Sequence, residues 1–99
     1  MTIKQLSVFI ENKAGRLYDV ARVLTQNKIN IRALSLAETT NFGILRLIVD
    51  QADEALNILK INEFTVGITN VIAVEVPDEV GGLASVLKIM DEAKINIEY

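Results

Sequence analysis

Hydrophobic residues alternate with polar or aromatic ones near the start of the chain, at Leu6, Val8 and Ile10. This period of two predicts a strand with one buried face. After the polar stretch ENKAGR the spacing changes to i, i+3, i+4, i+7, which predicts an amphipathic helix. Its apolar residues are Leu17, Val20, Ala21 and Leu24.

The pattern continues with three further strands and a second helix. The run from Ile29 leads into a strand that extends to about Glu38, and the turn cluster TTNFG joins it to a strand from Ile44 to Val49. Asp50 or Asp53 is expected to cap the second helix. The apolar stripe of that helix is Ala52, Ala55, Leu56 and Leu59. Phe64, Val66 and Ile68 then alternate with polar or small residues as a fourth strand.

The predicted order is βαββαβ, closing near Asn70. This is the α+β, ferredoxin-like plan, an antiparallel sheet with both helices on one face. One core is expected between the sheet and the helices, made of Leu6, Val8, Ile10, Leu17, Val20, Leu24, Leu47, Leu56, Leu59, Val66 and Ile68.

The pattern restarts after this unit, at an offset of 66 residues. Gly15 matches Gly81, and the run KINI occurs at both 28–31 and 94–97. Eight of the 27 ungapped pairs between 7–33 and 73–99 are identical. The repeated strand would carry Ile72, Val74 and Val76, and the repeated helix Leu83, Val86, Leu87 and Met90. Internal repetition at such a period indicates a duplicated structural unit.

The two copies divide the chain into residues 1–70, a complete unit, and 71–99, the first strand, the helix and the start of the second strand of another. The second copy lacks the hairpin, second helix and last strand that would cover its own helix. Either the chain is a fragment of a protein about 40 residues longer, by the length of the first copy, or a partner chain completes the half unit in a swap.

Composition removes several classes of function. The 99 residues include neither cysteine nor histidine, which excludes disulfides, thiolate nucleophiles and the commonest metal ligands and general base. No cofactor or metal is expected. A net charge of −3 argues against nucleic-acid binding. No apolar stretch reaches the length of a membrane span, because Arg46 interrupts the longest one. The N-terminus has no apolar signal core, so we expect a cytoplasmic protein.

The loop between the first strand and the first helix is the best candidate for binding. The first N–H groups of a helix lack intrahelical partners, and the helix dipole adds positive charge there. Gly15 would let a ligand approach the backbone, and the Asn12 amide can both donate and accept. Purely structural readings remain open: Gly15 as a turn glycine, Asn12 as a cap, and Asn30 as the left-handed residue that closes the helix.

A unit of about 70 residues with ENKAGRL after its first strand and KINI after its first helix resembles the ACT domain family. The whole chain resembles a small stand-alone tandem ACT protein with an incomplete second unit. The resemblance implies a regulatory, non-catalytic domain that binds a free amino acid where two units pair, and that modulates a metabolic enzyme or another partner.

The resemblance also implies which positions contact the ligand: the first loop, and the second strand of a neighbouring unit. In the first copy these are Asn12, Lys13, Ala14, Gly15, Arg16, Leu17, Asn30, Ile31 and Arg32. In the second copy they are Asp78, Glu79, Val80, Gly81, Gly82, Leu83, Asn96 and Ile97. Ala14 stands where the family often has proline, and Ile10 where serine-binding members tend to have histidine. Asp78 replaces the loop asparagine, so the two copies are expected to differ in binding.

Other families with this plan fit less well. Acylphosphatases carry an arginine inside the loop, whereas Arg16 would begin the helix and is expected to be solvated. RNA-binding domains need aromatics on the central strands, and the strand GILRLIV has none. Metal chaperones need paired cysteines. A structural interaction module without a ligand remains an alternative.

The open edges of such a sheet predict self-association. Exposed strand edges recruit further strands. Phe9, Ile44 and Ile48 would also need cover on the face opposite the core. We therefore expect a homodimer or higher oligomer, with sheets joined edge to edge or face to face. The alternative cover is the missing part of the second unit in the same chain.

Overall fold

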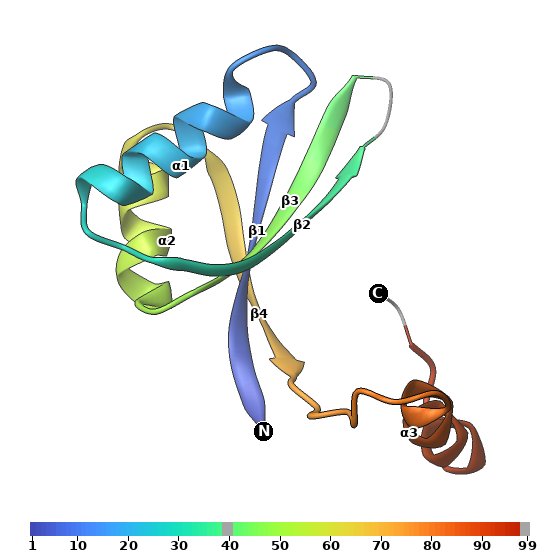
Figure 1. Ribbon diagram of the computed structural model, residues 1–99. Helices are drawn as coiled ribbons and strands as arrows, with labels where there is room; N and C mark the ends of the chain where they lie inside the picture. Colours follow the sequence, from blue (N-terminus) through green and yellow to red (C-terminus); the bar gives the residue numbers. More distant parts are fainter. Residues whose placement is uncertain (39–40, 98–99) are drawn as a thin grey trace.

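A computed structural model describes residues 1–38 and 41–97, and it has the predicted βαββαβ unit followed by a third helix (Figure 1). The elements are β1 (Thr2–Glu11), α1 (Arg16–Gln26), β2 (Ile31–Glu38), β3 (Phe42–Val49), α2 (Ala52–Ile61), β4 (Thr65–Ile72) and α3 (Gly82–Glu92). The predicted turn TTNFG includes Thr39 and Thr40, which lie outside the described residues. β3 begins at Phe42, two residues earlier than the pattern predicts.

The sheet is antiparallel throughout, with the strand order β2-β3-β1-β4. β1 is central: Leu6 is opposite Leu47 of β3 on one side and Ile68 of β4 on the other. Figure 1 shows α1 and α2 together on one face of the sheet, and α3 apart from both, beyond the end of β4. The α+β ferredoxin-like fold is thus confirmed, and β2 and β4 form the two edges.

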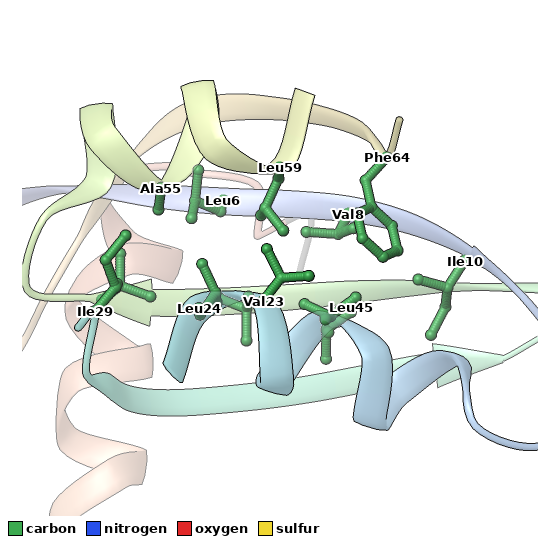
Figure 2. Packing of buried hydrophobic residues seen from close by; sticks show 13 residues of the cluster. Leu6, Val8, Ile10, Val23, Leu24, Ile29, Leu45, Ala55, Leu59 and Phe64 are labelled. Carbon is green, nitrogen blue, oxygen red and sulfur yellow. The ribbon is translucent and has the colours of Figure 1, made fainter. Parts of the chain in front are cut away.

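The core lies between the helices and the sheet, where side chains of α1, α2, β1 and β3 meet (Figure 2). Leu6, Val8, Val20, Leu24 and Leu59 are fully buried. Ile10 and Leu47 of the predicted set are also buried, and Leu56, Val66 and Ile68 pack against the core partly buried. The predicted core set omitted the other buried members, which are Val23, Ile29, Leu45, Val49, Ala55 and Phe64. Of these, Ala55 and Phe64 do lie on the predicted helix stripe and strand.

The prediction for Leu17 is wrong, because its side chain is 41% exposed. The buried face of α1 is made by Val20, Val23 and Leu24 instead. Leu17 lies in the first turn of α1 and lines a surface cavity with Leu36 of the edge strand β2. Within the described residues β2 is an edge of the sheet, so Leu17 lies at the border of the core rather than inside it.

The predicted cap of α2 is also wrong. Gln51, rather than either aspartate, is the N-cap residue, and it makes no side-chain cap hydrogen bond. Asp50 accepts a hydrogen bond from the Asn30 N–H at Oδ1, at 3.1 Å, and Asp53 pairs with Lys4, with 2.9 Å between Nζ and Oδ2. Both carboxylates therefore connect α2 to other elements of the fold.

The second repeat reproduces the backbone of the first at two turns. Gly15 and Gly81, the N-cap residues of α1 and α3, have φ of 88° and 86°. Lys28 and Lys94 are left-handed at 59° and 58°. The left-handed residue after each helix is thus the lysine of KINI, and the reading that assigned this role to Asn30 is wrong.

The prediction of a strand over Ile72, Val74 and Val76 is wrong for the part of the chain that follows Ile72. β4 continues to Ile72, and residues 73–77 form no strand. β4 is paired with β1 as far as Thr2, opposite Ile72, and one further backbone hydrogen bond joins the Ala73 N–H to the Met1 carbonyl at 2.7 Å. α3 forms as predicted, but Leu83 is 60% and Leu87 40% exposed. The division into units 1–70 and 71–99 stays a prediction; Glu98 and Tyr99 lie outside the described residues.

No helix within the described residues has the length and apolar character needed to cross a membrane.

We predict that Leu24→Ala lowers the free energy of unfolding by about 2–5 kcal/mol, as is typical of a fully buried leucine. Ile61→Ala is the matched control, because Ile61 is helical but 79% exposed. Chemical denaturation measures both. Equal, small losses for the two variants would place Leu24 outside the core.

Candidate functional site

The loop from β1 to α1 ends at a glycine N-cap. Gly15, the N-cap residue, has no side chain and so makes no side-chain cap hydrogen bond to α1. Its φ of 88° and ψ of −12° lie in the left-handed region, which favours glycine. A Cβ at Gly15 would meet nothing within 4 Å, so open space lies beside the start of the helix. The positive end of the α1 dipole therefore faces space that a ligand can enter.

The rest of the loop is fixed by backbone hydrogen bonds. The Asn12 N–H donates to the carbonyl of Asn41, at 3.0 Å, and the Lys13 N–H donates to the carbonyl of Glu11, at 2.9 Å. The Arg16 N–H donates to the carbonyl of Lys13 over 3.4 Å, a long bond. The loop is thus tied both to the chain that precedes β3 and to itself.

A cavity of about 110 Å³ lies between this loop and the end of β2. Its lining residues are Ile10, Glu11, Asn12, Lys13, Arg16, Leu17, Leu36, Glu38 and Gly43. Asn12, Lys13, Arg16 and Leu17 of the predicted set thus come together here, whereas Ala14 and Gly15 belong to the same loop but do not line the cavity.

Charges of both signs border this cavity. Lys13 pairs with Glu11, with 3.3 Å between Nζ and Oε2, and both side chains are exposed. Glu38 adds a second carboxylate from β2. The site can therefore present a cation and the helix N-terminus to an anionic group, and carboxylates to a cationic one.

The expectation of a solvated Arg16 is wrong. Its side chain is 26% exposed, its Nη1 lies 3.3 Å from Asp19 Oδ2, and its Cζ lies 4.8 Å from the ring centroid of Phe64. Because Phe64 is itself buried, this cation–π contact fixes Arg16 to the start of β4. One face of the Arg16 guanidinium therefore packs against the Phe64 ring.

The second predicted segment, Asn30–Arg32, lies at the opposite end of the sheet. Glu38 is opposite Gly43 near the loop, whereas Ile31 is opposite Val49 at the far end of β3. Asn30 is bound there to Asp50, whose N–H donates to the Asn30 carbonyl at 3.2 Å. Within one protomer this segment cannot contact a ligand at the loop.

Arg32 lines a different cavity, of about 520 Å³, at the start of α2. Its charged lining residues are Lys4, Arg32, Asp50, Asp53 and Glu54. Two of these charged residues, Lys4 and Asp53, already form an ion pair with each other.

The predicted residues of the second repeat are not brought together. Asp78, Glu79 and Val80 are exposed, and Gly81 has open space where a Cβ would lie. Gly82 has a structural role, because a Cβ there would collide with the carbonyl of Pro77. A separate cavity of about 340 Å³ is lined by Thr69, Asn70, Val71, Ile72, Met90, Ile95, Asn96 and Ile97, and Leu83 is not among them.

Sequence reasoning missed Leu36, Glu38 and Gly43 as neighbours of the loop. They come from the β2–β3 hairpin, whose end lies beside the end of β1 because Glu11 is opposite Phe42. Because the β2–β3 hairpin was predicted, its antiparallel pairing with the first strand could have indicated that these residues lie near the loop.

Comparison with protein families matches residues 1–99 to the family described as "ACT domain pair". The chain belongs to the ACT domain family.

Two solved structures cover the whole ACT chain. A protein from Bacteroides thetaiotaomicron is 47% identical with a TM-score of 0.96, and the chain covers 69% of it. The regulatory subunit of aspartate kinase from Thermus thermophilus is 15% identical with a TM-score of 0.70, and 78% of it is covered. The ACT domain of GTP pyrophosphokinase from Chlorobium tepidum is 17% identical at a TM-score of 0.52, with 70% of this chain and 100% of that one covered. At these lower identities the likeness is one of fold. Comparison with curated proteins gives no match.

We predict that Gly15→Ala lowers the free energy of unfolding of this ACT chain by about 1–2 kcal/mol, because L-residues are strained at positive φ. Gly67→Ala is the control: Gly67 lies in β4 without positive φ, and a Cβ there also meets open space. Thermal or chemical unfolding should show a loss only for Gly15→Ala. A neutral Gly15→Ala would mean that the turn does not require glycine.

Proposed function

We propose that this ACT chain is a non-catalytic regulatory unit that binds a free amino acid at the cavity between the Asn12–Leu17 loop and the end of β2. The observation that carries the proposal is the N-terminus of α1, with a glycine at the N-cap, beside a cavity bordered by charges of both signs. An amino acid is a zwitterion, so its recognition needs donors and acceptors a few ångströms apart.

The two ends of the ligand have distinct partners in this proposal. The carboxylate would meet the N–H groups at the start of α1, with Lys13 adding positive charge. The ammonium would meet Glu38 or Glu11, which line the same cavity, or the amide oxygen of Asn12. The contacts of Arg16 with Asp19 and Phe64 support positioning of the helix rather than the phosphate cradle of a hydrolase.

We infer that ligand binding modulates a metabolic enzyme in the cytoplasm, and that the unit acts as a homodimer or higher oligomer. The likeness to a regulatory subunit of aspartate kinase and to the ACT domain of GTP pyrophosphokinase supports the link to an enzyme.

Calorimetric titration with the twenty amino acids tests the proposal. We predict saturable binding of at least one, weakened by Asn12→Ala by about 0.5–1.5 kcal/mol through loss of one hydrogen-bonding group. Asn57→Ala, an exposed asparagine on α2, is the matched control and should bind normally. Absence of heat with every amino acid, from a folded protein, would favour the structural interaction module.

A further inference from the structure

The face of the sheet that is turned away from α1 and α2, here called the outer face, carries exposed apolar side chains. Among the described residues no helix packs on this face of β1 and β3 (Figure 1). Its side chains alternate along each strand with the buried core residues. Phe9 and Phe42, both on this face, are each 47% exposed. A cluster of exposed apolar side chains on one face marks a surface for interaction.

A hollow of about 390 Å³ opens near the end of β1. It is lined by Phe9, Ile10, Glu11 and Phe42, so two aromatic rings and one carboxylate border it, and none of the four residues is basic. Aromatic rings attract a cation held over them, and a carboxylate pairs with a guanidinium through charge-assisted hydrogen bonds. The lining therefore has the chemistry that recognises an arginine side chain.

The outer face also carries an arginine, away from this hollow. Arg46 is opposite Ser7, whereas Phe42 is opposite Glu11, so the two residues of β3 are four positions apart, or about 13 Å along the strand. Arg46 lines a different hollow, of about 160 Å³, together with Ile48. A hollow suited to arginine and an arginine outside it thus share one surface.

We propose that the outer face packs on the outer face of a second copy, and that the hollow of each protomer receives the partner's Arg46. A surface that carries both the hollow and the group that fills it is self-complementary, as a two-fold interface requires. The inference rests on the proposed function for the oligomer alone. It names the surface through which the copies join, and it does not depend on the amino-acid ligand.

Sheet packing restricts how the two copies can be placed. Packed sheets lie about 10 Å apart with nearly aligned strands, so the two-fold axis lies in the plane between them. An axis along the strands would keep Arg46 level with the partner's Arg46 and leave both hollows empty. An axis across the strands reverses their direction. When it passes over Ile44, midway between Phe42 and Arg46 in β3, it sets Arg46 above the partner's Phe42.

The reversed arrangement gives Arg46 both kinds of contact. Its guanidinium lies over the partner's Phe42 ring, and Glu11 is beside that ring because it is opposite Phe42 in the sheet. Glu11 already pairs with Lys13 at 3.3 Å, but both of these side chains are exposed, and such a pair contributes little. Phe9 and Ile44, which are opposite each other, stack on their own copies at the centre of the interface.

Cysteine cross-linking tests the arrangement, because the chain has no cysteine of its own. A bis-maleimide that spans about 10 Å, the spacing of packed sheets, should join two full chains through Ile44→Cys, and equally through Phe9→Cys. Ile48→Cys is the matched control, on the same face of the same strand. Its copies would be about 26 Å apart along the strand, so it should not cross-link.

Two cross-linking results overturn the arrangement. Absence of a cross-link through both Ile44→Cys and Phe9→Cys would mean that the outer faces do not meet. Equal cross-linking through Ile44→Cys and Ile48→Cys would mean that the strands of the two copies run in the same direction, which leaves the hollows empty.

Charge reversal tests the occupant of the hollow. Glu11→Arg should raise the dimer dissociation constant by about tenfold, because it removes one ion pair and adds a repulsion at each of the two hollows. Adding Arg46→Glu should restore most of the affinity. Light scattering across a dilution series measures both variants. A double variant that associates no better than Glu11→Arg overturns the pairing of Glu11 with the partner's Arg46.

Calorimetry on the cysteine variants separates this inference from the proposed ligand. Amino-acid binding by Ile44→Cys and Phe9→Cys chains that do not cross-link would leave the ligand site standing and overturn the interface. Cross-linking without binding of any amino acid would support the interface and overturn the ligand site.

Discussion

β1 hydrogen-bonds to β3 on one side and to β4 on the other, and Leu6 and Val8 within it are fully buried beneath the two helices. The central position of this strand determines where the loop that follows it lies. Because β1 ends at Glu11, opposite Phe42, the start of α1 comes beside the β2–β3 hairpin rather than at an outer corner of the fold. The cavity lies where the central strand β1 ends, the helix α1 begins and the β2–β3 hairpin turns.

The same architecture leaves β2 at the edge with leucines that α1 and α2 do not cover. Glu38, at the end of this edge strand, also lines the cavity, so the apolar edge and the candidate ligand site lie side by side. If a ligand at this site contacts two copies in the proposed oligomer, it binds the oligomer more tightly than the monomer, and linkage requires that it strengthen association by the same factor.

The sequence predicted the order of elements, the strand faces and most of the core, because alternation and helical spacing report directly on burial. The sequence prediction failed where contacts between elements distant in the chain determine the position of a residue. Leu17 continues the apolar stripe of α1 but lies over the edge of the sheet. Asp50 precedes α2 as a capping residue would, but its carboxylate accepts a hydrogen bond from the Asn30 N–H instead. Alternation over Ile72, Val74 and Val76 could not report that a strand needs a neighbour. For the candidate site, Gly15 predicted a turn at the start of α1, which the structure has, whereas the contact between Phe64 and Arg16 depends on the position of β4 and has no local signal in the sequence.

Mapping of amide chemical shifts during titration with the amino acid that binds tests the central claim most directly. The account predicts concentration-dependent shifts at the start of α1, at Arg16 and Leu17, together with Glu38 at the end of β2. Shifts confined to residues 50–54, around the larger cavity at the start of α2, would contradict it and would assign the ligand to the other end of the sheet.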